Sequence, residues 1–328
     1  MSTDCTTHHM FHMLSPLDEF IKWYPLTMTK YPAVVHVDID FAFKAPMDEL
    51  FDAIIYPKDS SQGKAARALI PLQNTKATIP DKIDAFFTRD WPQVRPGKKG
   101  LFQAGFVVVR PDPTVFDELK EIVLEGNYTE GFSGSNGWGG KGYGAYVGAM
   151  AMQGLMAYYW DVVRPNTAVE LNQCRYNWMG MDVRYNANPN FQPTSRRRGQ
   201  CRSSQRKCED CRQTNSTLIK SVHYTQCRKP WNCVGRGVEG GDDGTAIDTG
   251  SGNYEKCMEM VRMWHSYRTD LETKLYAITK DETIRKAASG EYMTTIFQGH
   301  CNTDGGSGYR QIDATETSFA RLPEIYNT

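Results

Sequence analysis

The 328-residue sequence lacks both long apolar runs and an excess of charge of either sign. No stretch approaches the roughly 20 consecutive apolar residues that span a bilayer. Residues 1–13 hold three histidines but no apolar core of the kind that a signal peptide needs. Lys plus Arg equals Asp plus Glu, at 38 each, so no global field attracts a polyanion. We therefore expect a globular chain with no membrane span that does not bind nucleic acid.

Cysteine is not scarce, and its distribution is uneven. Five of the nine cysteines fall between Cys201 and Cys233, and two N-glycosylation sequons stand at Asn127 and Asn215. Together these features favour the lumen of the secretory pathway, Golgi or endoplasmic reticulum, over a cytoplasmic location. We expect at least two disulfides within one set of seven cysteines. The set is Cys174, Cys201, Cys208, Cys211, Cys227, Cys233 and Cys257. A zinc site built from Cys208, Cys211, Cys227 and Cys233 is the alternative.

Alternating strand and helix signals predict an α/β fold. Helical spacing from Ser15 ends by Pro32 and would bury one face containing Leu17, Phe20, Ile21 and Tyr24. The β-branched run 34–37 predicts a buried strand, and 101–109 a second one. Asp112 then caps a predicted helix that Gly126 ends. Two strand-to-helix units in succession are typical of layered α/β architectures.

The remaining segments are recognised by their composition. Eight glycines between residues 131 and 148 predict a loop with positive φ angles, in which Trp138 and Tyr143 either line a sugar site or fill the core. We divide the chain into a main domain (1–234) with a Cys/Arg-rich insertion (195–215), followed by three shorter parts. These parts are a glycine-rich flexible loop at 235–252, a helical segment at 253–298, and a poorly ordered tail at 299–328.

Two carboxylates follow the first predicted strand, at Asp38 and Asp40. Ligands of open α/β sheets bind outside the carboxyl ends of the strands. Two neighbouring carboxylates repel each other unless a cation lies between them, and oxygen ligands suit Mn²⁺ or Mg²⁺. The pair therefore indicates a divalent metal site, although two solvated acids at a strand end would give the same pattern. His36, inside the strand, is interpreted as a hydrogen-bonded core histidine rather than as a ligand.

Several motifs, in order, resemble those of the glycogenin-like glycosyltransferases (family eight). They are the lysine-bearing helix around Lys22, the strand ending in Asp38-Ile39-Asp40, the Asp48–Asp52 segment, Phe102–Pro111, Tyr176-Asn177, and His223-x5-Lys229-Pro230-Trp231. The resemblance runs from about residue 15 to about residue 235. It implies a GT-A-type nucleotide-diphospho-sugar transferase fold, a Mn²⁺ (or Mg²⁺) cofactor, and retention of configuration during hexosyl transfer from a nucleotide-diphosphate sugar to an acceptor.

The resemblance also implies roles for individual residues. Asp38, Asp40 and His223 would be the metal ligands, and Lys22 and Lys229 would lie near the donor, with Lys229 facing its diphosphate. Gln103 would contact the donor sugar or the acceptor, and Gln153 corresponds to the glutamine of the family's Asp-Gln pair.

Two departures from the family pattern matter. Met152 stands where the family has the acid that handles the donor sugar, and methionine cannot replace a carboxylate as a hydrogen-bond acceptor. Only 33 residues precede Val34, too few for the strands that normally come first in this fold. We therefore expect the first strands to be missing, the strand at Val34 to have an open edge, and nucleotide binding to be weak. A non-catalytic nucleotide-sugar or glycan-binding relative is the alternative function.

Overall fold

The computed structural model describes residues 19–89, 93–94, 99–144, 148–179, 200–205, 209–225, 227, 230 and 254–279. The chain divides into two compact units. The first comprises 1–178 and 182–221, and the second comprises 179–181 and 222–328. The boundary at 221/222 falls inside one short strand, β10 (Ser221–His223).

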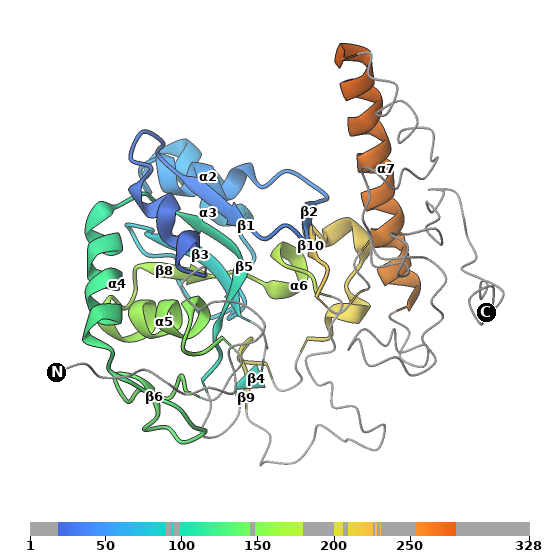
Figure 1. The fold of residues 1–328 in the computed structure, drawn as a ribbon. Coiled ribbons are helices and arrows are strands. Elements are labelled where there is room, and N and C mark those ends of the chain that lie inside the picture. The colour runs from blue at the N-terminus through green and yellow to red at the C-terminus, as the bar shows by residue number, and fades with distance from the viewer. Residues whose placement is uncertain are drawn as a thin grey trace, which may run out of the picture. The chain divides into compact units, whose positions relative to one another are not determined.

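The first unit is built on a four-stranded mixed sheet (Figure 1). Its strands, in spatial order, are β1 (Val34–Val37), β5 (Phe102–Val109), β3 (Ala85–Arg89) and β8 (Ala168–Glu170). β1 and β3 are antiparallel to β5, and β8 is parallel to β3. Three strands therefore run in one direction, and the carboxyl ends of β1, β3 and β8 lie at the same edge as the start of β5. The predicted α/β class is confirmed.

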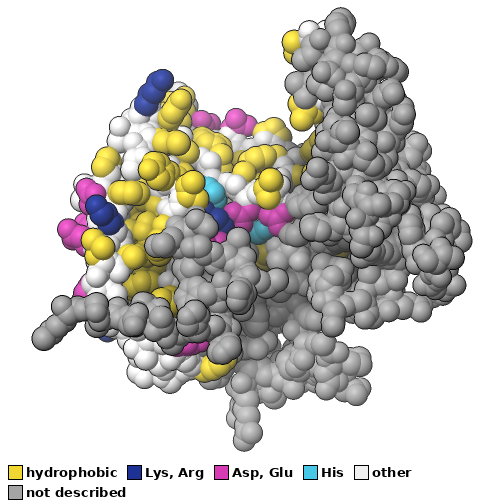
Figure 2. All heavy atoms as spheres, in the orientation of Figure 1, with side chains coloured by type: hydrophobic (Ala, Val, Ile, Leu, Met, Phe, Trp, Pro, Cys, Tyr) yellow, Lys and Arg dark blue, Asp and Glu magenta, His cyan; other side chains and the backbone are white. Residues whose placement is uncertain are grey.

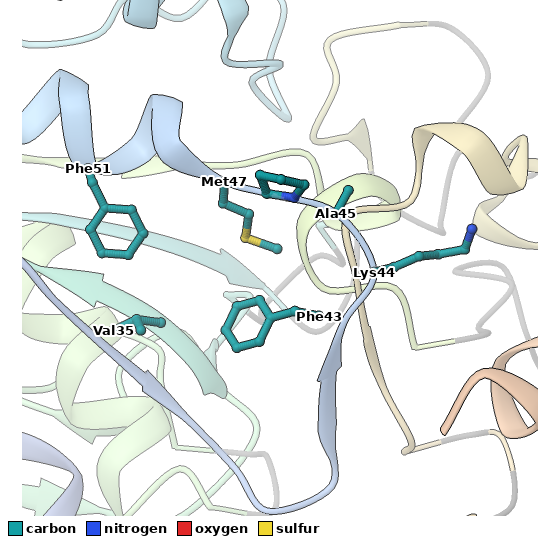
Figure 3. Close-up of a pocket in the computed structure, with 7 residues that line it drawn as sticks. Val35, Phe43, Lys44, Ala45, Met47 and Phe51 are labelled. Carbon is teal, nitrogen blue, oxygen red and sulfur yellow. The ribbon is translucent and has the colours of Figure 1, made fainter. Parts of the chain in front are cut away.

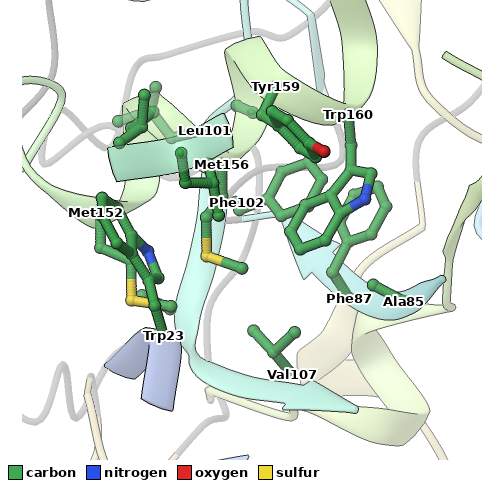
Figure 4. Close-up of a cluster of buried hydrophobic side chains, with 14 of the residues drawn as sticks. Trp23, Ala85, Phe87, Leu101, Phe102, Val107, Met152, Met156, Tyr159 and Trp160 are labelled. Atoms are coloured by element: carbon green, nitrogen blue, oxygen red, sulfur yellow. The ribbon is translucent and has the colours of Figure 1, made fainter. Parts of the chain in front are cut away.

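Each face of the sheet buries its own cluster of apolar side chains. On one face, Phe86 and Val108 pack with side chains of α2 (Asp48–Ile55) and α3 (Ser61–Leu69). On the other face, Phe87 and Val107 pack in a cluster that also contains residues of α4 (Pro113–Glu125) and α5 (Met152–Tyr158) (Figure 4). Successive strand residues thus point into opposite layers, as the two-residue period of a strand requires.

The predicted helix after the second strand is confirmed at both ends. The Asp112 side chain accepts a hydrogen bond from the backbone N–H of Thr114, and Pro113 occupies the first turn of α4. Gly126 ends the helix with φ of 66°. An L-residue with a side chain would be strained in that left-handed conformation, so the glycine acts as a C-cap.

The prediction for the first helix was wrong in its type and in part of its buried face. Residues Phe20–Thr27 form a 3-10 helix, in which Ile21 and Tyr24 are 67% and 59% exposed. Trp23 and Leu26 are buried instead, and Phe20 packs against the same cluster. A 3-10 helix has three residues per turn, so positions three apart share its inner face. Ser15, where the helix was predicted to begin, lies outside the described residues.

β1 is an edge strand and is only half-buried, whereas the sequence predicted full burial. Among the described residues β5 is its sole partner in the four-stranded sheet, which agrees with the expected open edge. Beside it lies an apolar cavity of about 420 Å³, lined by side chains that include Val35, Phe43, Met47 and Phe51 (Figure 3).

The glycine-rich segment forms a loop around a two-stranded ribbon, β6 (Tyr128–Thr129) and β7 (Gly137–Trp138). Six of its glycines have positive φ angles, as predicted. Trp138 and Tyr143 are buried in the same cluster as α4 and α5, so they fill the core. The indole N–H of Trp138 donates to the carbonyl oxygen of Ala149 at 3.0 Å. This bond ties the loop to the start of α5.

The remaining short elements of the described chain include two further ribbons and several single turns. The ribbons pair β2 (Phe41–Phe43) with β10, and β4 (Gln93–Val94) with β9 (Gln200–Cys201). The turns are η2 (Tyr159–Val163), α6 (Gln173–Tyr176), η4 (Cys211–Gln213) and η5 (Ser216–Leu218).

The described part of the second unit is dominated by α7 (Tyr254–Thr279), which lies within the helical segment predicted at 253–298. The hydroxyl of Tyr224 donates to the carbonyl oxygen of Met260 on this helix at 2.6 Å. Among the described helices, none combines the length and apolar character needed to cross a bilayer. The predicted glycine-rich loop at 235–252 and the tail at 299–328 lie outside the described residues.

Two disulfides join cysteines of the described residues, which confirms the prediction of at least two within the set of seven. Cys174 pairs with Cys211 in the first unit, and Cys227 pairs with Cys257 in the second. The four-cysteine zinc site is therefore excluded, because Cys211 and Cys227 are already in disulfides with other partners. Disulfides favour an oxidising, secretory-type compartment.

Candidate metal site

The turn that leaves β1 carries the two aspartates. The backbone N–H of Asp38 donates to the carbonyl oxygen of Gly105 on β5 at 3.1 Å, which extends the sheet by one step. The carbonyl oxygen of Asp38 then accepts from the N–H of Phe41 at 3.2 Å and closes a tight turn into β2. Ile39, at the tip, is 94% exposed. The turn presents Asp38 and Asp40 at the carboxyl edge of the sheet.

The strand paired with β2 brings in the histidine. Ser221 at the start of β10 is fixed by the backbone N–H of Trp178, which donates to its carbonyl oxygen at 3.1 Å. The Ser221 hydroxyl donates to the carbonyl oxygen of Tyr176. His223, the last residue of β10, is buried. One ligand atom each of Asp38, Asp40 and His223 lies within 4.8 Å of the others. The convergence expected from the sequence is present.

This donor set fits a divalent ion. Ligand atoms that surround one hard cation at about 2.0–2.6 Å lie at most about 5 Å apart. Two carboxylates and one imidazole suit Mn²⁺ better than a soft metal, and three protein ligands leave coordination positions for oxygens of a substrate. Whether the three residues bind a metal stays a prediction.

Two further nitrogen-bearing side chains lie beside the first aspartate. Lys22 Nζ lies 2.8 Å from Asp38 Oδ1, and His36 Nε2 lies 3.4 Å from the same oxygen. Among the described residues, the buried Nε2 of His36 has no hydrogen-bond partner, so the expectation of a hydrogen-bonded core histidine is not met. On the face in Figure 2, histidine, basic and acidic side chains gather beside one another among hydrophobic ones. The ammonium of Lys22 offsets part of the repulsion between the aspartates.

The other predicted site residues have different surroundings. Gln103, at the start of β5, is buried, and its side-chain oxygen accepts from the backbone N–H of Gly105 at 2.7 Å. Gln153 on α5 lies against Gly148, where an added Cβ would come within 2.8 Å of its side-chain oxygen. Met152 is fully buried in the apolar cluster that also contains Trp23 (Figure 4). Lys229 lies outside the described residues.

Sequence reasoning missed a charged network at the same edge of the sheet. Arg89 ends β3 and Glu170 ends β8, the parallel neighbour of β3. The Arg89 guanidinium lies 2.6 Å from Asp161 Oδ1 and 3.4 Å from Glu170 Oε2. Arg202 also pairs with Glu170, and Tyr143 donates its hydroxyl hydrogen to Asp161. A charged residue directly after each apolar strand run was the available signal, but nothing in the sequence paired the two.

Burial and ion pairing shift the pKa values in this network in opposite directions. Burial alone would raise the pKa of the Asp161 carboxyl, but the charge and hydrogen bond of Arg89 hold it below the ordinary value. Burial, followed by the negative charge of Asp161, raises the pKa of Tyr143. Asp161 is therefore an anion held by a buried cation, and Tyr143 is a neutral hydrogen-bond donor.

Comparison with known proteins identified no relative of this chain. The chain matches no protein-family model, no curated protein and no solved structure.

Proposed function

We propose that the chain is a Mn²⁺-dependent, retaining hexosyltransferase of the GT-A type. It would transfer a sugar from a nucleotide-diphosphate donor to a glycan, protein or lipid acceptor in the Golgi or endoplasmic reticulum lumen. The single observation that carries the proposal is the convergence of Asp38, Asp40 and His223 at the carboxyl edge of an α/β sheet. The two disulfides support the compartment.

The chemistry of sugar transfer requires what this edge offers. The bond between the anomeric carbon and the β-phosphate oxygen breaks, a bond to an acceptor hydroxyl oxygen forms, and that hydroxyl loses its proton. Negative charge grows on the departing diphosphate. A divalent ion, when bound, would stabilise that charge as a Lewis acid. Asp38, Asp40 and His223 would hold the ion, and the ammonium groups of Lys22 and Lys229 would bind diphosphate oxygens.

Two glutamines are proposed to position the reacting sugars. Gln103, the second residue of β5, lies at the same edge as Asp38. Its amide oxygen accepts from the Gly105 N–H, so its amide nitrogen is the end proposed to contact a sugar. Gln153 is proposed to contact the donor sugar from the start of α5.

The alternative function is a non-catalytic relative that binds nucleotide sugars or glycans. The observation that favours it is Met152, which is buried in the core and brings no carboxylate to the site. Incubation with a panel of nucleotide-diphosphate sugars, Mn²⁺ and mixed acceptors separates the two functions. Chelator-sensitive release of free nucleoside diphosphate supports the enzyme, whereas donor binding without release supports the alternative.

Lys22 gives a prediction about the metal alone. Its ammonium lies 2.8 Å from Asp38 Oδ1, so it competes with any cation that approaches the same oxygen. Lys22→Met should therefore tighten Mn²⁺ binding about tenfold in the absence of nucleotide, equivalent to about 1.4 kcal/mol. The same variant should bind a nucleoside diphosphate with Mn²⁺ more weakly than the parent does.

Isothermal titration measures both affinities. Lys64→Met, the same substitution at an exposed lysine of this unit, is the control and should leave them unchanged. Weaker Mn²⁺ binding by Lys22→Met would mean that the lysine organises the aspartates rather than competing for them.

A further inference from the structure

A second cavity of the first unit is polar and larger than the one beside β1. Its volume is about 1020 Å³, at the upper end of the roughly 300–1,000 Å³ range of small-molecule sites. Its lining includes Gln73, Asn172, Arg175, Glu209 and Arg212. The residues proposed to hold the metal, diphosphate and donor sugar do not line it.

The walls of this cavity are fixed to one another. The segment 71–73 pairs with the chain just beyond β8 through an isolated bridge between Leu72 and Leu171. The Asn172 N–H donates to the carbonyl oxygen of Pro71 at 3.0 Å. The segment 209–213 is held by the Cys174–Cys211 disulfide. The indole N–H of Trp178 also donates to the Cys211 carbonyl oxygen, at 2.7 Å. These bonds hold the walls of the cavity in fixed positions relative to one another.

Two buried amides of the lining each keep one hydrogen-bonding end available. Gln73 is 2% exposed; its oxygen accepts from the Gln173 N–H at 3.0 Å, while its Nε2 has no partner among the described residues. Asn172 is 8% exposed; its Nδ2 donates to Glu209 Oε2 at 2.8 Å, while its Oδ1 has no partner there. A buried polar atom without a partner costs free energy, so a ligand that supplies both an acceptor and a donor would be favoured.

The charges and apolar groups of the lining narrow the class of ligand. Two arginines, Arg175 and Arg212, are balanced by two carboxylates, and Arg212 is already paired with Asp210 at 3.1 Å. A lining without net charge does not favour a diphosphate or any other strong anion. The hydrocarbon surface of residues 70–72 offers an apolar patch beside the amides. Hydroxyl groups, which both donate and accept, together with C–H faces are the chemistry of a neutral sugar.

We propose that this cavity binds a neutral oligosaccharide. Its assignment as the acceptor rests on the proposed function, whereas the binding itself does not. The cavity follows the carboxyl end of β8, and β1 lies three strand spacings away, roughly 14 Å at about 4.8 Å per step. Both sites therefore occupy one edge of the sheet. An acceptor chain anchored at 73 and 172 would reach the metal site with a sugar several units along.

Saturation-transfer NMR with four neutral tetrasaccharides tests the proposal: maltotetraose, cellotetraose, mannotetraose and chitotetraose. A heparin tetrasaccharide is the anionic comparison, and all samples contain EDTA and no nucleotide. At least one neutral probe should receive saturation from the parent protein. Gln73→Glu keeps the oxygen that accepts from Gln173 but removes the free donor, so it should weaken binding at least fivefold.

Two further variants separate loss of a contact from loss of the fold. Gln205→Ala changes an exposed residue of another wall and should also weaken binding. Gln62→Glu, the same exchange as at Gln73 but on exposed α3, should leave binding unchanged. Failure of all four neutral probes would overturn the proposal, as would preference for the heparin fragment or unaltered binding by both cavity variants. If the neutral sugars bind in EDTA but no nucleotide is released in the separate assay with Mn²⁺, the cavity assignment stands and the transferase function is rejected.

Discussion

Asp40→Asn is expected to abolish Mn²⁺-dependent release of nucleoside diphosphate. Asn has nearly the same size as Asp but lacks the charge that holds a divalent cation, and amide oxygen is a weaker ligand. Asp40 is one of the three candidate metal ligands that converge on the site among the described residues. Loss of several kcal/mol of charge stabilisation at the departing diphosphate corresponds to a rate loss of about a thousandfold. The variant should also lose Mn²⁺ binding in a calorimetric titration.

The matched control is Asp59→Asn, which makes the same exchange at an exposed aspartate before α3. It should behave as the parent in both assays, and the folding of both variants should be compared by thermal unfolding. If Asp40→Asn and the parent release nucleotide at equal rates in the presence of Mn²⁺, the reaction does not use this site. If His223→Ala retains full metal binding while Asp40→Asn does not, the ligand set was wrongly assigned.

The sequence correctly predicted those helices and strands whose ends or patterns depend on residues within one or two turns of the chain. Asp112 and Gly126 mark the two ends of α4 because an aspartate cap and a left-handed glycine act within one turn. The strand run before Asp38 and the strand 102–109 were also found, since a β-branched run gives a clear pattern. The convergence of the two aspartates with His223 was predicted from the order and spacing of the motifs. No local pattern in the sequence indicates that contact.

What the sequence missed depends on pairing between distant segments. Ile21 and Tyr24 were assigned to a buried face because an α-helical period was assumed, and the three-residue turn reversed that assignment. Arg89 lies 72 residues before Asp161 and 81 residues before Glu170. The parallel pairing of β3 and β8 brings Arg89 and Glu170 together, and Asp161 joins them from η2. No pattern within a short window encodes such a meeting.

The buried ion pairs of Arg89 with Asp161 and Glu170 lead to a prediction about stability. Arg89→Met should lower the free energy of unfolding by about 3–5 kcal/mol, because it leaves a largely buried carboxylate without its cation. The Arg89 side chain is 6% exposed, and its guanidinium also packs over the rings of Phe87 and Phe102. Asp161 is 30% exposed, which places the expected loss toward the lower end. In this variant Glu170 keeps one cationic partner, because Arg202 still pairs with it.

Denaturant unfolding measures the loss, and Lys58→Met is the matched control. Lys58 pairs with Asp81 on the surface, where solvent screens both charges, so removing that pair should cost much less stability than removing Arg89. A double variant, Arg89→Met with Asp161→Asn, should recover part of the stability because no unpaired charge remains. Equal losses for the Arg89 and Lys58 variants would show that the buried network contributes no more than a surface ion pair.

The dependence on pH distinguishes the ion pair from simple packing around Arg89. In the parent, the pKa of Asp161 lies below its ordinary value of 3.8, so the pairing contributes stability above that pH, and the contribution is lost as pH falls through the folded-state pKa. In Arg89→Met the cation is gone and burial raises the pKa of the same carboxyl, so the folded state binds a proton more readily than the unfolded state does. The difference in unfolding free energy between parent and variant should therefore be largest near neutral pH and should shrink as pH falls toward and below 3.8. A difference that stays constant between pH 7 and pH 4 would mean that the loss comes from the hydrocarbon and ring contacts of Arg89 and not from its charge.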